Sequence, residues 1–169
     1  PYSDWAAAAK SIQDAVDAAA TGDEIVVTNG VYATGGRAVV GTETNRVAVD
    51  KPLMVRSVNG PQFTIIKGFQ VPEPTSFERA IRCVYLTNGA SLSGFTLTNG
   101  GAWDGGGVLC ESEAAVVSNC VVAGNSAREG GGAHSGTLNN CTLTGNWAGD
   151  SGGGACYGTL YNCTLTGNW

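Results

Sequence analysis

Charged residues are scarce in this chain of 169 residues. Asp, Glu, Lys and Arg make up 14% of the sequence, against roughly 25% in an ordinary soluble domain. The nine Lys and Arg residues form no cluster, and the net charge is −5. The sequence therefore lacks the basic surface that neutralises nucleic-acid phosphates, and we expect no nucleic-acid partner.

Long apolar runs and targeting segments are missing as well. No stretch approaches the roughly 18 consecutive apolar residues of a membrane-spanning helix, so we expect no membrane span in this chain. The sequence opens with Pro1-Tyr2-Ser3-Asp4-Trp5, which has neither the basic start nor the apolar stretch of a signal peptide.

The Cys and His patterns of metal sites are also absent. The chain has one histidine, His134, and six cysteines, but no Cys-x-x-Cys pair and no Cys/His spacing typical of zinc sites. We therefore expect no metal site and no cofactor. An even number of cysteines is compatible with disulfides in an exported protein, but their repeated placement favours free thiols that pack as small hydrophobic groups.

Glycine and internal repetition are what the sequence has in abundance. It contains 26 glycines, and the segment Gly136–Trp147 returns 22 residues later, almost unchanged, as Gly158–Trp169. A looser copy spans Ser118–Asn125, and glycine triplets begin at Gly105, Gly130 and Gly152. Periods of 20 to 50 residues predict stacked supersecondary units.

Each repeat can be assigned the parts of a coil. In Cys141-Thr142-Leu143-Thr144 side chains alternate with period two, which predicts inward Cys and Leu and outward Thr. Asparagines recur at the corners on both sides of this strand, where stacked amides can bond to one another as ladders. The expected structural columns are Asn119, Asn140 and Asn162; Asn125, Asn146 and Asn168; and Cys120, Cys141 and Cys163.

The chain before these repeats predicts a cap and irregular coils. Ser11 is a suitable N-cap with Asp14 three residues later, and Thr21-Gly22 is a helix stop. We expect residues 1–24 to form an N-terminal cap with a short amphipathic helix, residues 25–107 to form irregular coils, and residues 108–169 to form regular repeats of 21 to 25 residues, the last incomplete. Residues 69–80 predict a projecting loop. All belong to one domain, 1–169.

Two stretches resemble known families. The N-terminal stretch resembles the cap and first coil of the pectate-lyase-like superfamily, through Ser11–Ala19, Gly22-Asp23, Ile25–Val27, Asn29-Gly30 and Tyr32. The segment 124–155, with its Gly-Asn and Gly-Gly-Gly-Ala motifs, resembles bacterial surface β-helix repeats of the polymorphic outer-membrane type. The resemblance implies an all-β, right-handed parallel β-helix of about five or six coils with an N-terminal capping α-helix.

The superfamily contains lyases, hydrolases, adhesins and inert stalks, so fold alone does not give function. The leading expectation is a non-catalytic, secreted or cell-surface bacterial solenoid segment with a structural or adhesive role and glycans as partners. The alternative is a polysaccharide lyase or glycosidase, which needs grouped carboxylates and a Lys or Arg. Ca²⁺ would be a cofactor only in the lyase alternative.

The sequence gives only weak support to the candidate catalytic residues of that alternative. Glu111 and Glu113 share a face if strand alternation continues through them, and Asp104 approaches through the preceding loop. Arg79 and Arg82 are the basic candidates, as part of a surface strip. A solvated edge and isolated surface charges explain the same residues.

Two outward-facing patterns carry minor hypotheses. The Thr-x-Thr pairs at Thr96, Thr142 and Thr164 resemble the flat ranks of ice-binding solenoids, although Val121 and Ala123 interrupt them. Trp147 and Trp169 can stack on sugars or pack against their corners.

The last repeat stops at Trp169, before its glycine triplet. A solenoid that ends within a coil exposes unpaired strand edges, which natural proteins normally cover. We therefore expect further repeats, or cover from another molecule, including end-to-end self-association.

Overall fold

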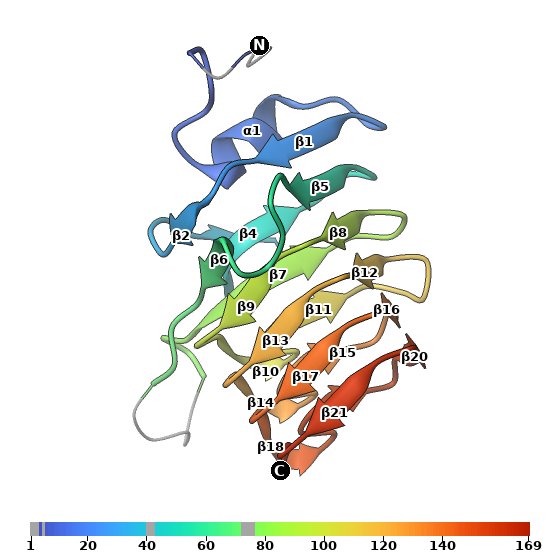
Figure 1. Ribbon diagram of the computed structural model, residues 1–169. Helices are drawn as coiled ribbons and strands as arrows, with labels where there is room; N and C mark the ends of the chain where they lie inside the picture. The colour runs from blue at the N-terminus through green and yellow to red at the C-terminus, as the bar shows by residue number, and fades with distance from the viewer. Residues whose placement is uncertain (1–3, 5, 40–42, 72–76) are drawn as a thin grey trace.

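The computed structural model describes residues 4, 6–39, 43–71 and 77–169. Short strands stack in parallel, one coil on the next, into an elongated solenoid (Figure 1). The helix α1 (Ile12–Ala18) lies at one end, beside β1, and the C-terminus lies at the other. The expected all-β parallel solenoid with a capping helix is confirmed.

The described residues form four sheets. The first sheet contains, in order, β1 (Glu24–Val27), β5 (Met54–Ser57), β8 (Ser91–Ser93), β12 (Val116–Ser118), β16 (Thr137–Asn139) and β20 (Thr159–Tyr161). The second sheet contains β2 (Gly30–Tyr32), β6 (Thr64–Lys67), β9 (Thr96–Thr98), β13 (Val121–Ala123), β17 (Thr142–Thr144) and β21 (Thr164–Thr166). Both sheets therefore run through six coils.

The other two sheets close the coils. The third sheet contains β3 (Arg37–Ala38), β4 (Thr44–Val49), β7 (Ile81–Leu86), β11 (Val108–Cys110), β15 (Ala133–His134) and β19 (Ala155–Cys156). The fourth sheet contains β10 (Gly101–Asp104), β14 (Ser126–Glu129) and β18 (Trp147–Ser151). Every pairing between these strands is parallel except β3 with β4.

The core consists of apolar columns that run along the stack. In β17, Leu143 is fully buried, whereas Thr142 and Thr144 on the opposite face are half-buried. Leu143 stacks in register between Val122 and Leu165. Burying such a leucine stabilises the fold by about 2 kcal/mol, so the period-two pattern places the apolar side chains of every coil in one continuous interior.

The glycine triplets allow adjacent coils to approach closely at one corner. Gly130 has φ of +63°, a left-handed conformation that glycine adopts without strain. A Cβ on Gly131 would lie 2.1 Å from the carbonyl oxygen of Trp147 in the next coil. Any larger residue there would force the two coils apart.

The cap helix begins as the sequence indicates but ends differently. Ser11 Oγ accepts a hydrogen bond from the Asp14 backbone N–H at 3.1 Å. The helix ends at Ala18, and Ala19 is already extended, so Thr21-Gly22 is not the stop. Instead, Lys51 Nζ donates to the carbonyl oxygens of Val16 and Ala19, both at 2.8 Å, and satisfies the helix C-terminus.

At the opposite end, the inward-pointing leucines of the last coil lack cover in the described residues. Leu160 is half-buried and Leu165 is 51% exposed, whereas Leu138 and Leu143, one coil earlier, are fully buried.

The centre of the expected 69–80 loop, residues 72–76, lies outside the described residues. In the described segments, no helix has the length and apolar character needed to cross a membrane.

Candidate functional site

The acidic residues proposed as catalytic do not form one site. Asp104 ends β10, whereas Glu111 and Glu113 lie in the turn after β11. The strand ends at Cys110, so strand alternation does not extend to the two glutamates and that expectation is wrong. Within the described ranges, no hydrogen bond or ion pair joins Asp104 to either glutamate.

Glu111 instead ties two coils together. Its carboxylate accepts hydrogen bonds from the Tyr85 hydroxyl, from Thr87 Oγ1 at 2.6 Å and from the Asn88 backbone N–H at 3.0 Å. The bonds from Thr87 and Tyr85 hold the pKa of Glu111 below its ordinary value. Burial, together with Glu111, raises the pKa of Tyr85 to about 12.

Arg82 is an interior residue. Its side chain is 2% exposed, and its guanidinium donates to Asn45 Oδ1 at 2.6 Å, to the Asp104 carbonyl oxygen at 2.8 Å and to the Glu43 carboxylate at 2.5 Å. Arg79 is exposed in the turn before β7. The expected surface strip containing both arginines is therefore wrong, because the charge of Arg82 is satisfied by interior oxygen atoms.

One asparagine column is a hydrogen-bonded ladder. Asn125 Nδ2 donates to Asn146 Oδ1 at 3.0 Å, and Asn146 Nδ2 donates to Asn168 Oδ1 at 2.9 Å. Each of these side-chain oxygens also accepts a backbone N–H from the preceding coil. Asn125 and Asn146 are 1% and 0% exposed, so these amides bond to one another and to the backbone instead of to water.

The other asparagine column is not such a ladder. Asn119, Asn140 and Asn162 have φ of 52°, 53° and 51°, a left-handed conformation that asparagine tolerates. Among the described residues, no side-chain hydrogen bond joins the three amides; Asn119 Nδ2 donates to Ser93 Oγ at 3.3 Å. The physical reason is that these amides lie at the surface, where water satisfies them.

The cysteine column lies inside the coils. Cys120 and Cys141 are 1% and 2% exposed, and Cys163 is half-buried. All six cysteines lie in the described part of the chain and are free thiols. The neighbouring Cys120 thiol lowers the pKa of Cys141, while burial raises the pKa of Cys120 well above its ordinary value.

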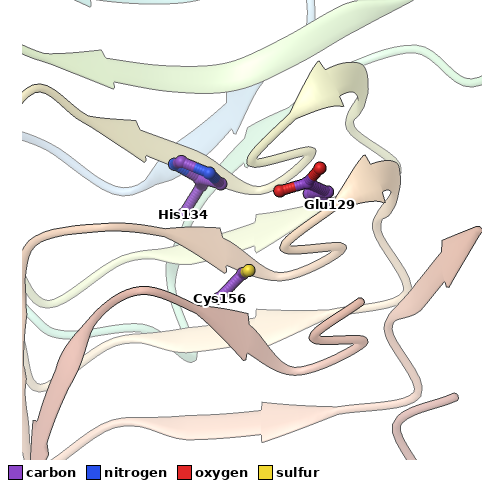
Figure 2. Close-up of side chains that lie close together, drawn as sticks. All are labelled: Glu129, His134 and Cys156. Carbon is purple, nitrogen blue, oxygen red and sulfur yellow. The ribbon is translucent and has the colours of Figure 1, made fainter. Parts of the chain in front are cut away.

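A second cluster, Glu129, His134 and Cys156, brings together three types of potential metal ligand. One side-chain O, N or S atom from each residue lies within 4.8 Å of those of the other two. Figure 2 shows His134 and Cys156 on neighbouring strands, with Glu129 at the adjoining corner. We refer to these three residues as the Glu-His-Cys cluster.

The local fold explains how the cluster forms. Gly130 follows Glu129 in a left-handed conformation and turns the chain sharply into β15, which carries His134. Stacking then places Cys156 of β19 in register with His134. Cys156 is 9% exposed and lies outside the apolar core.

Neighbouring polar groups contact each member of the cluster. Ser135 Oγ lies 3.2 Å from His134 Nδ1, Arg128 donates to Glu129 Oε1 at 2.9 Å, and Ser151 Oγ lies 3.6 Å from Cys156 Sγ. The Tyr157 ring packs edge-on to the His134 ring, with centroids 5.4 Å apart.

Sequence reasoning missed this cluster because it searched for metal-ligand spacings within short segments. His134 and Cys156 are 22 residues apart and become neighbours only when successive coils stack. The available signal was the repeat itself: aligning the triplets at Gly130 and Gly152 places His134 opposite Cys156.

The stacking of the coils also determines how the outward-facing threonines and tryptophans line up. Val121 and Ala123 lie in register between the threonines of β9 and β17 and interrupt the Thr columns. Trp147 and Trp169 occupy the same position in adjacent coils and are 40% and 79% exposed.

A groove beside α1 is lined by apolar residues such as Ile12, Ala15 and Ile25, and by none of the five charged candidates in the described segments.

Comparison of the chain with protein-family models, curated proteins and solved structures found no match.

Proposed function

We propose that this chain is a non-catalytic solenoid segment of the pectate-lyase-like type, secreted or displayed on a bacterial cell surface, with a structural or adhesive role. The observation that carries the proposal is that the most strongly repeated side chains bind the next coil. Asn125, Asn146 and Asn168 bond to one another along the stack, and the repeated leucines fill its interior. A chain that devotes its repeated residues to stacking is suited to building an extended rod.

The placement of the charged candidates favours this proposal over a polysaccharide lyase or glycosidase. Arg82 is buried and its guanidinium is bonded to interior oxygen atoms, and Glu111 accepts three hydrogen bonds. An acid or base must reach the proton that it transfers, and a lyase needs its carboxylates and basic group on one face. Asp104, Glu111 and Arg79 come from three different parts of the coil.

The adhesive form of the proposal rests on exposed aromatic side chains in the last two coils. These are Trp147, Tyr157, Tyr161 and Trp169. Exposed Trp and Tyr offer large, rigid contact surfaces at low cost in conformational entropy. Sugar rings present apolar faces that fit such surfaces, so glycans are the proposed partners.

A glycan array tests the adhesive form. The wild-type chain should bind a subset of glycans, and Trp147→Ala should reduce that binding. Trp103→Ala is the matched control. Trp103 lies in β10 of the same sheet and is similarly exposed, at 43%, but its ring packs against Phe77. Absence of binding to any glycan, or equal loss in both variants, would contradict the adhesive form.

A panel of uronate-containing polysaccharides, incubated with and without Ca²⁺, tests the enzymatic alternative. We expect no new reducing ends and no unsaturated product. Unsaturated product that depends on the chain would overturn the non-catalytic proposal.

A further inference from the structure

We propose that the Glu-His-Cys cluster is a binding site for a divalent transition metal of the zinc class, with Glu129, His134 and Cys156 as its three protein ligands. This site is independent of the structural role proposed above. It lies at the corner between the fourth and third sheets, on the outer surface of the coil.

The chemistry of the three groups selects the class of metal. A thiolate, an imidazole and a carboxylate are the three ligand types that zinc takes in proteins. Ca²⁺ and Mg²⁺ prefer all-oxygen sites, so a cysteine and a histidine disfavour them. Three protein ligands leave a fourth tetrahedral position for water.

The geometry lies within reach of metal coordination. The ligand atoms lie within 4.8 Å of one another, and in a tetrahedral zinc site they would be roughly 3.5 Å apart. Rotation of the half-buried Glu129 and His134 side chains towards the nearly enclosed Cys156 thiol closes this difference of about 1 Å. His134 and Cys156 are held at adjacent positions of neighbouring parallel strands, so the backbone need not move.

Surrounding groups favour a defined orientation of the imidazole. Ser135 Oγ lies 3.2 Å from Nδ1 of His134. If Nδ1 donates its proton to this hydroxyl, the lone pair on Nε2 remains for the metal, an arrangement common around metal-bound histidines. Metal binding releases the thiol proton of Cys156 to solvent, because the thiolate is the ligand.

Arg128 is the one cation that contacts the cluster in the described residues. It bonds to Glu129 Oε1 at 2.9 Å and lies 3.7 Å from Asp150 Oδ2. Its side chain is 47% exposed, and exposed ion pairs are weak. Arg128 can therefore move towards Asp150 when a metal takes the carboxylate of Glu129.

Titration of the whole chain with Zn²⁺ tests the site. The chain is freed of metal with a chelator, kept reduced, and titrated with Zn²⁺ in competition with a chromophoric chelator. We expect one equivalent to bind and the unfolding temperature to rise, since a ligand that binds only the folded state stabilises it. With Co²⁺ in place of Zn²⁺, we expect a thiolate-to-cobalt charge-transfer absorption.

The repeat itself supplies variants that the fold accepts. His134→Leu introduces the residue that stands in register one coil earlier, Leu109, and Glu129→Ser introduces the residue that stands one coil later, Ser151. We expect these variants and Cys156→Ser to weaken Zn²⁺ binding by at least about tenfold, since loss of even an outer partner of a metal ligand costs that much. Cys156→Ser should also abolish the charge-transfer absorption.

Cys163→Ser is the matched control, because Cys163 is a partly exposed thiol of the interior column, outside the cluster. It should bind Zn²⁺ as the wild type does. Absence of stoichiometric binding, or binding that survives both His134→Leu and Cys156→Ser in folded protein, would overturn the proposal. So would loss of binding in Cys163→Ser with retention in Cys156→Ser, which would place the metal on the thiol column.

Discussion

Asparagine serves two purposes in each regular coil, and its burial decides which one. Asn146 is 0% exposed, and its amide bonds to both neighbouring coils. Asn140, six residues earlier, is exposed and occupies a left-handed turn. Loss of the first amide leaves buried groups without partners, whereas loss of the second costs only backbone strain.

This difference predicts unequal costs for two alanine substitutions. Asn146→Ala removes the acceptor of the buried Asn125 backbone N–H and one hydrogen bond each from the Asn125 side chain and the Val122 carbonyl, and should lower the free energy of unfolding by about 3 kcal/mol. Asn140→Ala should cost about 1 kcal/mol, and Asn140→Gly should restore most of that loss. Urea denaturation measures all three; equal costs for both alanine variants would contradict the assignment of the ladder.

Glu111 predicts a pH-dependent contribution to stability. Hydrogen bonds from Thr87 and Tyr85 hold its folded-state pKa below the ordinary value of 4.5. The ionised group therefore stabilises the fold above about pH 4.5, and this stabilisation is lost as the pH falls through the lowered folded-state pKa. Because the side chain is exposed, the contribution is about 1 kcal/mol or less.

Urea midpoints measured between pH 7 and pH 2 check this prediction. Glu111→Gln should be less stable than the wild type at neutral pH, and the difference should shrink in acid. Glu113→Gln is the control, since its exposed carboxylate makes no hydrogen bond in the described residues, and it should follow the wild type. A Glu111→Gln deficit that does not change with pH would contradict the argument.

At the scale of elements, the cap helix is attached to the first coil by side chains. Gln13 exchanges two hydrogen bonds with the backbone of Ala48, at 2.8 and 3.2 Å, and thereby satisfies backbone groups at the edge of β4 that faces the helix. Lys51 closes the other end of the helix by bonding to its last carbonyl groups. A positive charge also interacts favourably with a helix C-terminus.

The role of Lys51 predicts a specific loss on substitution. Lys51→Met keeps the apolar stem but removes three donated hydrogen bonds, and should lower the free energy of unfolding by about 1 to 2 kcal/mol. Lys10→Met, at an exposed lysine next to Ser11, removes the same charge without touching the helix C-terminus and should be nearly neutral. Thermal unfolding followed by circular dichroism compares the two.

The elements that sequence analysis predicted best are those that repeat. The apolar positions of β16, β17, β20 and β21 follow directly from the alternation around Leu143 and Leu165. Arg82 was misjudged because its partners, Asn45, Glu43 and the carbonyl oxygen of Asp104, come from other coils that share no motif with it. Likewise, the Glu-His-Cys cluster exists only through coil register, which pattern searches within one segment do not examine.

At the scale of the whole molecule, the strands of each coil pair with those of the coils before and after it, whereas the last described coil is covered on one face only. Leu165 is 51% exposed although its register partner Leu143 is fully buried. In such a quasi-one-dimensional stack, stability depends on contacts between neighbours. Local opening should therefore be easiest in β20 and β21 and hardest in the middle coils.

Hydrogen exchange on the chain, with and without an appended coil, tests this last prediction. Amides of β20 and β21 should exchange fastest among the strands of the first two sheets. A second copy of residues 148–169, one 22-residue repeat, added after Trp169 should slow their exchange by about tenfold, because covering Leu160 and Leu165 recovers roughly 1.5 kcal/mol of burial. A control copy with serines in place of its own two inward leucines should protect them much less. Equal protection by both copies would show that the added backbone hydrogen bonds, and not the apolar column, hold one coil to the next.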